Sequence, residues 1–200
     1  MQLSFSHKKA TQALNFFARA AGGKINKMKA LKLIYFADRY HLRSYGRPIT
    51  NDTYFAMKFG PVASQCLNLL NENEDYTAPE ENKYRQAFLE RENNEHYASK
   101  AAVNETVLSQ TDLESLNYAW ENYKDKDQFE LAEETHRFPE WQQHKAALDS
   151  ELATRRFMSY LDFLENPEQG VEKLPLLTEE IKEDLAEELH SLQAVESIWS

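Results

Sequence analysis

The stretch from Asn26 to Leu70 constrains the fold more than any other part of the sequence. In its first half, apolar residues recur at three- and four-residue steps, and others widen the arc that they form on a helix: Met28, Leu31, Leu33, Ile34, Tyr35, Phe36, Ala37, Tyr40 and Leu42. A helix that is apolar over most of its circumference is a buried helix. We therefore predict a long helix at the centre of a domain, ended by Gly46 and Pro48.

The second half of this stretch predicts a strand followed by another helix. Alternation places four side chains on one face of the strand: Thr53, Phe55, Met57 and Phe59. Gly60-Pro61 is then expected to open a helix, because proline is favoured at the first helical position. Helix, turn, strand and helix form one compact unit.

Composition limits the number of domains and the kinds of partner. With 200 residues, of which 42% are hydrophobic and 12% aromatic, the chain can bury the core of one domain. Its 23 basic and 33 acidic side chains give a net charge of −10, so nucleic acid is not an expected partner. The one concentrated basic patch is predicted to be a solvated helix face, and it is the single feature in favour of DNA binding: Lys24, Lys27, Lys29 and Lys32.

The cysteine content and the N-terminus bear on the compartment. Cys66 is the only cysteine, which excludes an intrachain disulfide and a thiolate zinc site, and we expect it in the core. The N-terminal residues lack the apolar core of a signal peptide, and no run of about 20 apolar residues is present. We expect a cytoplasmic protein without a membrane partner.

Helices are predicted on both sides of the central unit. Ser6 is positioned to cap a helix over residues 7–21. Downstream, a capping-box pattern at 111–114 opens another helix, and Asp127 caps a short one. Apolar spacing predicts a further helix over 152–164.

The remaining segments predict a small sheet. Residues 71–82 are acidic and polar, which is typical of a surface loop. Residues 84–91 and 96–101 flank an Asn-Asn pair and predict a hairpin that joins the strand at 53–59. The predicted fold class is mainly α (α+β), with an antiparallel sheet of about three strands.

Three parts of the chain are distinguished by composition. We predict one domain over residues 1–165, a linker over 166–177 that contains Pro and Gly, and an amphipathic helix over 178–200.

Two groups of residues imitate metal-ligand spacing. Asp38 and His41 stand three apart on the central helix, and His136, Glu140 and His144 recur at four-residue steps. The proline that precedes Glu140 interrupts the helical spacing of the second group. We therefore predict no metal site; a metal-dependent enzyme that uses Asp38, His41 and His136 is the most distant alternative.

No motif selects a reaction. The chain has no GxSxG elbow and no glycine-rich phosphate loop, and no base is evident beside Cys66. We predict no catalytic residues, no cofactor and no enzyme. Asp38-Arg39 and His136 are instead predicted to belong to a buried polar network.

The run KALKLIYFADRYHLRSYGRPITNDTYFAMKFGPV resembles the signature of the Panacea domain, the SocA-like antitoxin family. The matching positions are Lys32, Leu33, Tyr35, Ala37, His41, Leu42, Gly46, Pro48, Ile49, Gly60, Pro61 and Val62. Downstream, LSQTDLESLNYAW resembles the opening of a family helix, and ELAEETHRFPEW resembles a second motif through Glu130, Leu131, Thr135, His136 and Trp141. The resemblance extends over residues 5–165.

The resemblance implies a mostly helical domain and an antitoxin that neutralises a separately encoded toxin by direct binding, with phage defence as a setting. One relative of this type is an adaptor that delivers its toxin to a protease, so an adaptor with a cellular protease as second partner is the alternative. A homo-oligomer stays open. The residues expected to be structural under this resemblance are Lys32, Tyr35, Asp38, Arg39, His41, Gly46, Pro48, Gly60, Pro61, His136 and Trp141.

The C-terminal helix is the predicted toxin-binding element, because an amphipathic helix after a linker can lay its apolar face into a groove. Its stripe consists of Ile181, Leu185, Leu189, Leu192 and Ile198, with Trp199 beside it. The alternative is that this stripe packs on its own domain. Truncation after Glu172 is expected to leave a folded domain that no longer neutralises, and the acidic residues of 72–75 and 179–188 are expected to steer a basic toxin.

Overall fold

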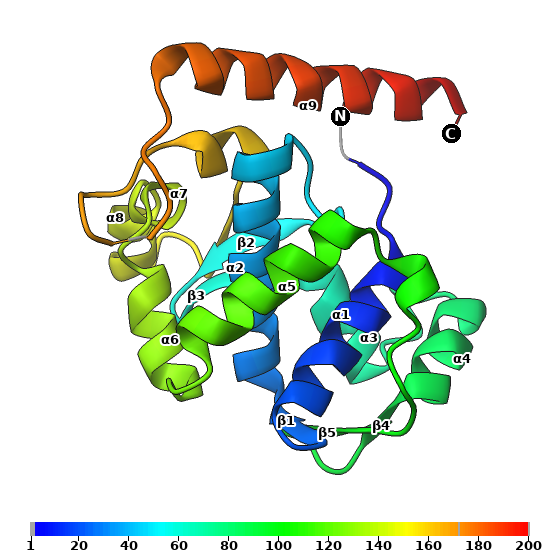
Figure 1. Ribbon diagram of the computed structural model, residues 1–200. Coiled ribbons are helices and arrows are strands. Elements are labelled where there is room, and N and C mark those ends of the chain that lie inside the picture. The colour runs from blue at the N-terminus through cyan, green and yellow to red at the C-terminus, as the bar shows by residue number, and fades with distance from the viewer. Residues whose placement is uncertain (1–2, 172, 200) are drawn as a thin grey trace.

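The computed structural model describes residues 3–171 and 173–199, and it is organised around the helix α2 (Lys27–Tyr45). From Ala30 to Arg43, every residue of this helix except Tyr40 is buried. The Asn26 side chain caps it by accepting from the Lys29 N–H at 3.1 Å, and Gly46 ends it in the left-handed conformation with φ 71°. The predicted central helix is confirmed (Figure 1).

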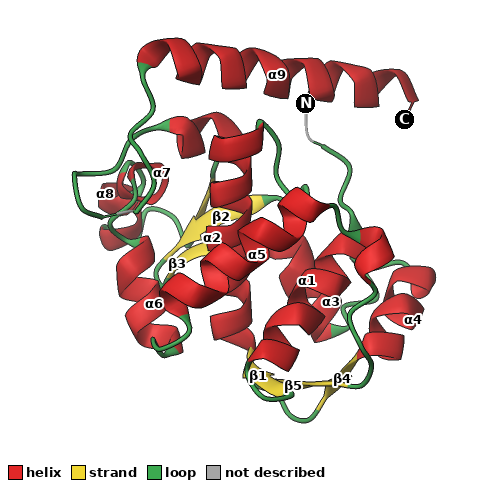
Figure 2. Cartoon of the chain, in the orientation of Figure 1, coloured by secondary structure: helices red, strands yellow, loops and turns green. Residues whose placement is uncertain are grey.

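The other helices surround α2. They are α1 (His7–Ala20), α3 (Ser64–Asn71), α4 (Pro79–Phe88), α5 (Gln110–Tyr123), α6 (Gln128–Thr135), α7 (Pro139–Gln142), α8 (Lys145–Asp149), α9 (Glu179–Trp199) and the 3-10 turns η1 (Glu105–Val107) and η2 (Tyr160–Leu164). The α5 helix crosses α2 in close contact, and Phe36 of α2 stacks on Tyr123 of α5 with ring centroids 3.7 Å apart. Helices therefore make up most of the fold (Figure 2), and the predicted class, mainly α with a small antiparallel β component, is confirmed.

The described strands form two antiparallel sheets of three strands each. One has the order β1-β5-β4, from β1 (Lys24–Asn26), β5 (His96–Ser99) and β4 (Leu89–Arg91). The other has the order β3-β2-β6, from β3 (Gly60–Ala63), β2 (Tyr54–Met57) and β6 (Arg155–Phe157). The predicted union of the hairpin with the strand at 53–59 is therefore wrong: the hairpin pairs with the short strand before α2, whereas β2 pairs with β3 and β6.

Two boundaries differ from the sequence-based expectation. Gly60-Pro61 belongs to β3 and α3 begins at Ser64, because Gly60 has φ +88° and closes a tight β2–β3 turn in which Met57 pairs with Gly60. Residues 79–88 form α4 where a loop and a strand were expected; Pro79 stands at the start of this helix, and the Glu81 carboxylate accepts from the Ala78 N–H at 3.0 Å.

Capping also differs in detail. The capping box of α5 uses Ser109 and Asp112, two residues before the expected pair, while Asp127 caps α6 as predicted. Ser6 precedes α1 but makes no side-chain capping bond. The helix expected over 152–164 is absent: this segment contains β6 and η2. Pairing of β6 with β2 replaces the helix, an interaction between segments about 100 residues apart that local apolar spacing does not reveal.

The chain ends with α9, which lies across one end of the domain, over η2 and the end of α2 that Gly46 terminates (Figure 1). The segment that leads to it is fastened by Asn166, whose side chain bonds to the N–H and the C=O of Leu177 at 2.8 and 2.7 Å. Arg43 of α2 donates to the Asn166 side chain at 2.9 Å. No helix among the described residues is long and apolar enough to cross a membrane.

Candidate functional site

The side chains that the sequence singles out on α2 point into the domain. Lys32, Tyr35, Asp38, Arg39 and His41 are each at most 2% exposed. Burial of so many polar groups is costly unless each finds partners, so their contacts decide what they can do.

Tyr35 and Arg39 meet the carboxylate of Glu140. The Tyr35 hydroxyl and the Arg39 Nε donate to Glu140 Oε1 at 2.6 and 2.7 Å, and both charged side chains are at most 1% exposed. The Arg39 guanidinium also lies over the Phe138 ring at 4.5 Å and donates to the Glu165 carbonyl at 3.2 Å. This ion pair joins α2, α7 and the segment after η2. No local pattern links Glu140 to Arg39, which is about 100 residues away.

Asp38 organises the loop that follows α2. Its carboxylate accepts from the backbone N–H groups of Ile49 and Thr50 at 2.8 and 3.1 Å, from the Thr50 hydroxyl, and from the Tyr54 hydroxyl at 2.9 Å. Burial raises the pKa of Asp38, although these four hydrogen bonds oppose the rise. The carboxylate is occupied by the protein itself.

Asp52 holds the start of α3 in a similar way. Its two oxygens accept from the backbone N–H groups of Gln65 and Cys66 at 2.8 and 2.7 Å. Burial raises the pKa of Asp52 to about 7, and Cys66 is fully buried as predicted. The carboxylate satisfies N–H groups that have no partner within the helix.

His41 has a different set of partners from Asp38 and connects α2 to α5. Its Nδ1 lies 2.6 Å from the Arg47 carbonyl, and its Nε2 lies 3.2 Å from Asp112 Oδ1. Burial alone would raise the pKa of Asp112, but bonds from His41, the Lys9 ammonium at 2.6 Å and the Ser109 N–H hold it well below its usual range. Asp38 and His41 therefore do not converge on one ion.

Lys32 closes the β2–β3 turn from inside. Its Nζ donates to the carbonyls of Phe59 and Pro61, the latter at 2.9 Å, and burial lowers its pKa to about 7. A Cβ on Gly60 would lie 2.7 Å from Lys32 Nζ and would also collide with the Thr135 hydroxyl. The prediction that Lys32 belongs to a solvated basic face is wrong, because it is 2% exposed.

His136 packs against Trp141 instead of joining the other candidate ligands. The two rings stack with centroids 3.8 Å apart, and Trp141 Nε1 donates to the Met57 carbonyl at 2.9 Å. Burial lowers the pKa of His136, which favours the neutral imidazole. Within the described ranges, no group of three or more His, Cys, Asp or Glu side chains could hold a metal ion, so His136, Glu140 and His144 form no such group.

The remaining positions of the expected structural set are also in the interior. Gly46, Pro48, Gly60 and Pro61 are buried. The Glu188 carboxylate of α9 lies against Gly46, where a Cβ would collide with it. Gly46 therefore both ends α2 and admits the close approach of α9.

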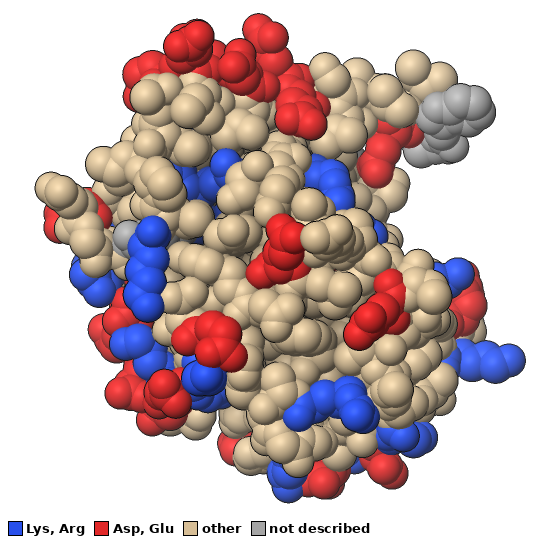
Figure 3. Space-filling view, in the orientation of Figure 1, with Lys and Arg blue, Asp and Glu red and all other residues tan. Residues whose placement is uncertain are grey.

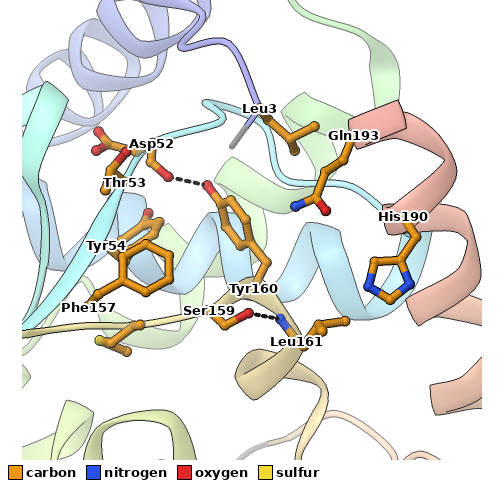
Figure 4. A pocket seen from close by; sticks show the side chains of 11 residues that line it. Leu3, Asp52, Thr53, Tyr54, Phe157, Ser159, Tyr160, Leu161, His190 and Gln193 are labelled. Carbon is orange, nitrogen blue, oxygen red and sulfur yellow. Dashed lines mark hydrogen bonds between the residues drawn. The ribbon is translucent and has the colours of Figure 1, made fainter. Parts of the chain in front are cut away.

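A cavity of about 310 Å³ lies between β2, β6, η2 and α9 (Figure 4). The Tyr160 hydroxyl donates to the Asp52 carbonyl at 2.7 Å, and His190 and Gln193 of α9 face Tyr160 across the cavity. Burial raises the pKa of Tyr160 well above its usual value, so it stays a neutral hydrogen-bond donor. The cavity contains no pair of activated groups that would indicate a reaction.

The predicted stripe of α9 divides into two parts. Leu189 is 1% exposed, and Leu185 and Leu192 are half-buried against the core. Ile181 and Ile198, by contrast, are 44% and 76% exposed. The side chain of Trp199 lies outside the described part of the chain. Figure 3 shows acidic side chains gathered along the outer side of α9.

The outer face of the β3-β2-β6 sheet is a surface that the sequence did not indicate. It carries large side chains that are partly or mostly exposed: Phe55, Met57, Val62 and Phe157, with Leu67 and Tyr76 beside them. We call these six residues the sheet face. The expected alternation at 53–59 showed apolar side chains on one face of one strand, but it could not show that they stay exposed.

Comparison with known proteins identifies the family. A family model described as antitoxin SocA-like, Panacea domain, matches residues 31–142, which contain α2 from Leu31 onward, both strands of the β2–β3 turn, Glu140 and Trp141. No curated protein and no solved structure matches the chain. The match covers more than half of the 200 residues. This chain belongs to the SocA-like antitoxin family and carries its Panacea domain.

Proposed function

We propose that this protein is the antitoxin of a toxin–antitoxin system and neutralises its toxin by binding it directly, without catalysis. The observation that supports this most is the family match over residues 31–142. The contacts of the buried polar side chains agree with a role without catalysis, because Asp38, Asp52 and Lys32 form hydrogen bonds with the protein's own backbone. Groups used in this way stabilise a fold and are not free to act on a substrate.

We further propose that the motif residues supply the scaffold and that exposed side chains recognise the toxin. The outer side of α9 is one such surface: Ile181 and Ile198 are exposed, and acidic residues occupy the first half of the helix. Leu189, which is buried, fastens the helix to the domain. Partner choice then depends on residues outside the buried network, as in other folds that host several specificities.

The test is to express the products of the genes adjacent to this one and to identify among them a protein that arrests growth. Growth arrest by that protein alone, rescue by co-expression of the full-length antitoxin, and a stable near-equimolar complex after purification are the expected results. Growth arrest without rescue, or rescue without a complex, would overturn neutralisation by binding.

The half-life of the toxin separates steric neutralisation from the adaptor alternative. Under direct binding, the toxin persists in the complex whether or not cellular proteases are present. Loss of the toxin that requires both the antitoxin and a protease would instead support the adaptor.

Removal of α9 tests its contribution. Truncation after Glu172 should leave the network of Arg39 and Glu140 intact, because Tyr35, Phe138 and Glu165, which contact that pair, precede the cut. The shortened protein should still unfold in one cooperative transition, with its far-UV dichroism lowered only by the helix removed, and should lose neutralisation. A folded truncation that protects fully would remove α9 from the toxin-binding surface.

A further inference from the structure

The sheet face presents apolar side chains on the side of the sheet away from α2. In β2 and β3, Tyr54, Ala56 and Ala63 are at most 1% exposed, and α2 contacts β3 on that side. Since side chains alternate across a strand, Phe55 and Val62, which are paired in register, point the other way. A solvated sheet face normally carries polar residues there.

The third strand continues this surface. Phe157 pairs with Phe55 across β6 and β2, and their rings meet edge to face with centroids 6.2 Å apart. Phe157 is 51% exposed, Phe59 at the β2–β3 turn is 57% exposed and Tyr76 is 74% exposed. Contiguous exposed apolar side chains of this kind mark interaction sites.

Two grooves share residues of the sheet face, one at its edge against the start of α2 and the other along the face itself. One, of about 390 Å³, is lined by α2 and the β2–β3 turn, and the other, of about 520 Å³, is lined by β2, α3 and Arg155. Met57, Val62 and Leu67 line both, so the grooves are parts of one surface. Together the grooves offer room for more than one side chain of a partner.

The charge of this surface is opposite to that of the chain. Its accessible cations are Lys27, Lys58 and Arg155, and its lining includes no described Asp or Glu, although acidic residues outnumber basic ones by 33 to 23 overall. None of these three cations makes an ion pair with a described residue. The Arg155 guanidinium lies over the Phe55 ring at 4.9 Å, so it extends the apolar surface and stays available to an anion.

We propose that the sheet face is the principal docking surface for the toxin, and that it takes a segment of the toxin that carries Asp or Glu beside large apolar side chains. This inference rests on the proposed function. Apolar side chains of the segment fill the grooves at Met57 and Val62, and its carboxylates pair with Lys58 and Arg155. The combination of a desolvated apolar centre with a charged rim is the usual anatomy of a specific interface.

A second copy of this chain suits the surface less well. The acidic amphipathic segment that the chain itself offers is α9, and the middle of its apolar stripe is already buried at Leu189. Single-stranded nucleic acid also suits it less well, because Phe55 and Phe157 meet edge to face and form no flat stacking platform, and the net charge of −10 repels phosphates.

The experiment uses the full-length antitoxin and the toxin purified from the co-expressed complex. Lys58→Glu combined with Arg155→Glu should weaken toxin binding at least about tenfold, because like charges then face the carboxylates. Lys83→Glu, a charge reversal of an exposed lysine on α4, is the matched control and should change the Kd by less than about twofold. Thermal unfolding of each variant shows that the fold is retained.

The outcomes separate this inference from the proposed function. Wild-type affinity in a folded double variant overturns the sheet face as the docking surface while leaving the antitoxin function in place. Failure of the wild-type protein to bind and neutralise overturns both. A dimer in solution that dissociates in the double variant identifies a second copy as the occupant, and binding of a labelled single-stranded RNA that is lost in the variant identifies nucleic acid; either result overturns the toxin as occupant. As a second variant, Phe157→Ser tests the apolar part without altering charge.

Discussion

The two exposed apolar regions of this protein, α9 and the sheet face, differ in how much of each is already in use. The stripe of α9 is buried at Leu189 and half-buried on either side of it, and acidic side chains cover its outer side. On the sheet face, Phe55 and Phe157 contact each other but no described element covers them, and the nearby charges are positive. One region holds the molecule together and repels acidic partners, whereas the other is unoccupied and attracts them.

This difference shows that an amphipathic helix alone does not identify an interface. The apolar stripe of a helix can be recognised in the sequence because its residues are close together, but the sequence does not show what packs against that stripe. The cavity bounded by Phe157 on the sheet and by His190 on α9 places the two regions side by side, so one toxin can touch both. We expect the sheet face to contribute more to toxin binding than α9 does.

The largest loss of stability is expected from removal of the buried ion pair between Arg39 and Glu140, because this pair supports both regions. Glu140→Ala leaves the Arg39 guanidinium buried without its carboxylate, which should lower the free energy of unfolding by about 3–5 kcal/mol. Arg39 bonds to the segment that leads to α9, and the neighbouring Trp141 bonds to β2, so both regions should lose order together. Urea unfolding measures the loss.

The control for that variant is Glu133→Ala, whose side chain is 83% exposed. It should change the free energy of unfolding by less than about 0.5 kcal/mol. If Glu140→Ala were as mild, the buried pair would contribute no more than a surface contact, and the common foundation of the two regions would be disproved.

The next largest loss of stability is expected to be confined to the sheet face. Gly60→Ala introduces a Cβ at φ +88° that collides with Thr135, so we expect a loss of about 2–4 kcal/mol from backbone strain and overpacking together. Gly170→Ala is the matched control: Gly170 has φ +84°, but nothing lies within 4 Å of its added Cβ, so only the backbone cost of about 1–2 kcal/mol applies.

Amide hydrogen exchange distinguishes where the loss occurs. In Gly60→Ala, protection should fall first in β2 and β3, while α9 keeps the protection of the wild type. Equal losses in the two glycine variants would show that the close approach of Gly60 to Thr135 has no energetic consequence.

The contrast between α2 and the sheet face also explains which parts of the fold could be predicted from the sequence. The burial of α2 was predicted because its period of 3.6 residues is a local property, and Asp127 and Gly46 were recognised because caps act within one turn. The partners of the predicted residues were not: Glu140 and Asp112 lie about 70 to 100 residues from Arg39 and His41, and no periodicity links them.

The sheet face was missed for a related reason. Its strands β2 and β6 come from distant parts of the chain, and β6 has only three residues, too few to show alternation. Leu152 and Phe157 were instead assigned to a helix, because a short apolar spacing fits either period. In the structure, residues 155–157 pair with β2 and do not form the helix that the local pattern suggested.

A smaller effect should come from the titration of Lys32, which lies beneath the sheet face and not beneath α9. Burial lowers its folded-state pKa from 10.5 to about 7, so between these values the unfolded chain binds more protons and the free energy of unfolding rises with pH. The expected rise is about 1 kcal/mol per pH unit above pH 7, measured by urea unfolding.

Two variants assign this dependence. Lys32→Met should remove the rise above about pH 7. Asp52→Asn should leave that rise unchanged and alter the pH dependence of the free energy of unfolding below about pH 7. The pKa of Asp52 is raised to about 7 in the folded protein, so its contribution to stability is lost as the pH rises towards 7. A rise that persists in Lys32→Met would mean that another group titrates.

The smallest effect is expected at the free end of α9. Ile198→Ser removes an apolar side chain that is 76% exposed, and it should weaken toxin binding by about threefold or less, since most interface residues contribute under about 1 kcal/mol. Phe157→Ser, at 51% exposure on the sheet face, should weaken binding by about tenfold, because an aromatic side chain that becomes buried on binding is a typical anchor of an interface. Isothermal titration of both variants with the purified toxin gives the comparison directly. If Ile198→Ser cost more than Phe157→Ser, the docking surface would centre on α9, and the cations of the sheet face would have to serve a different partner.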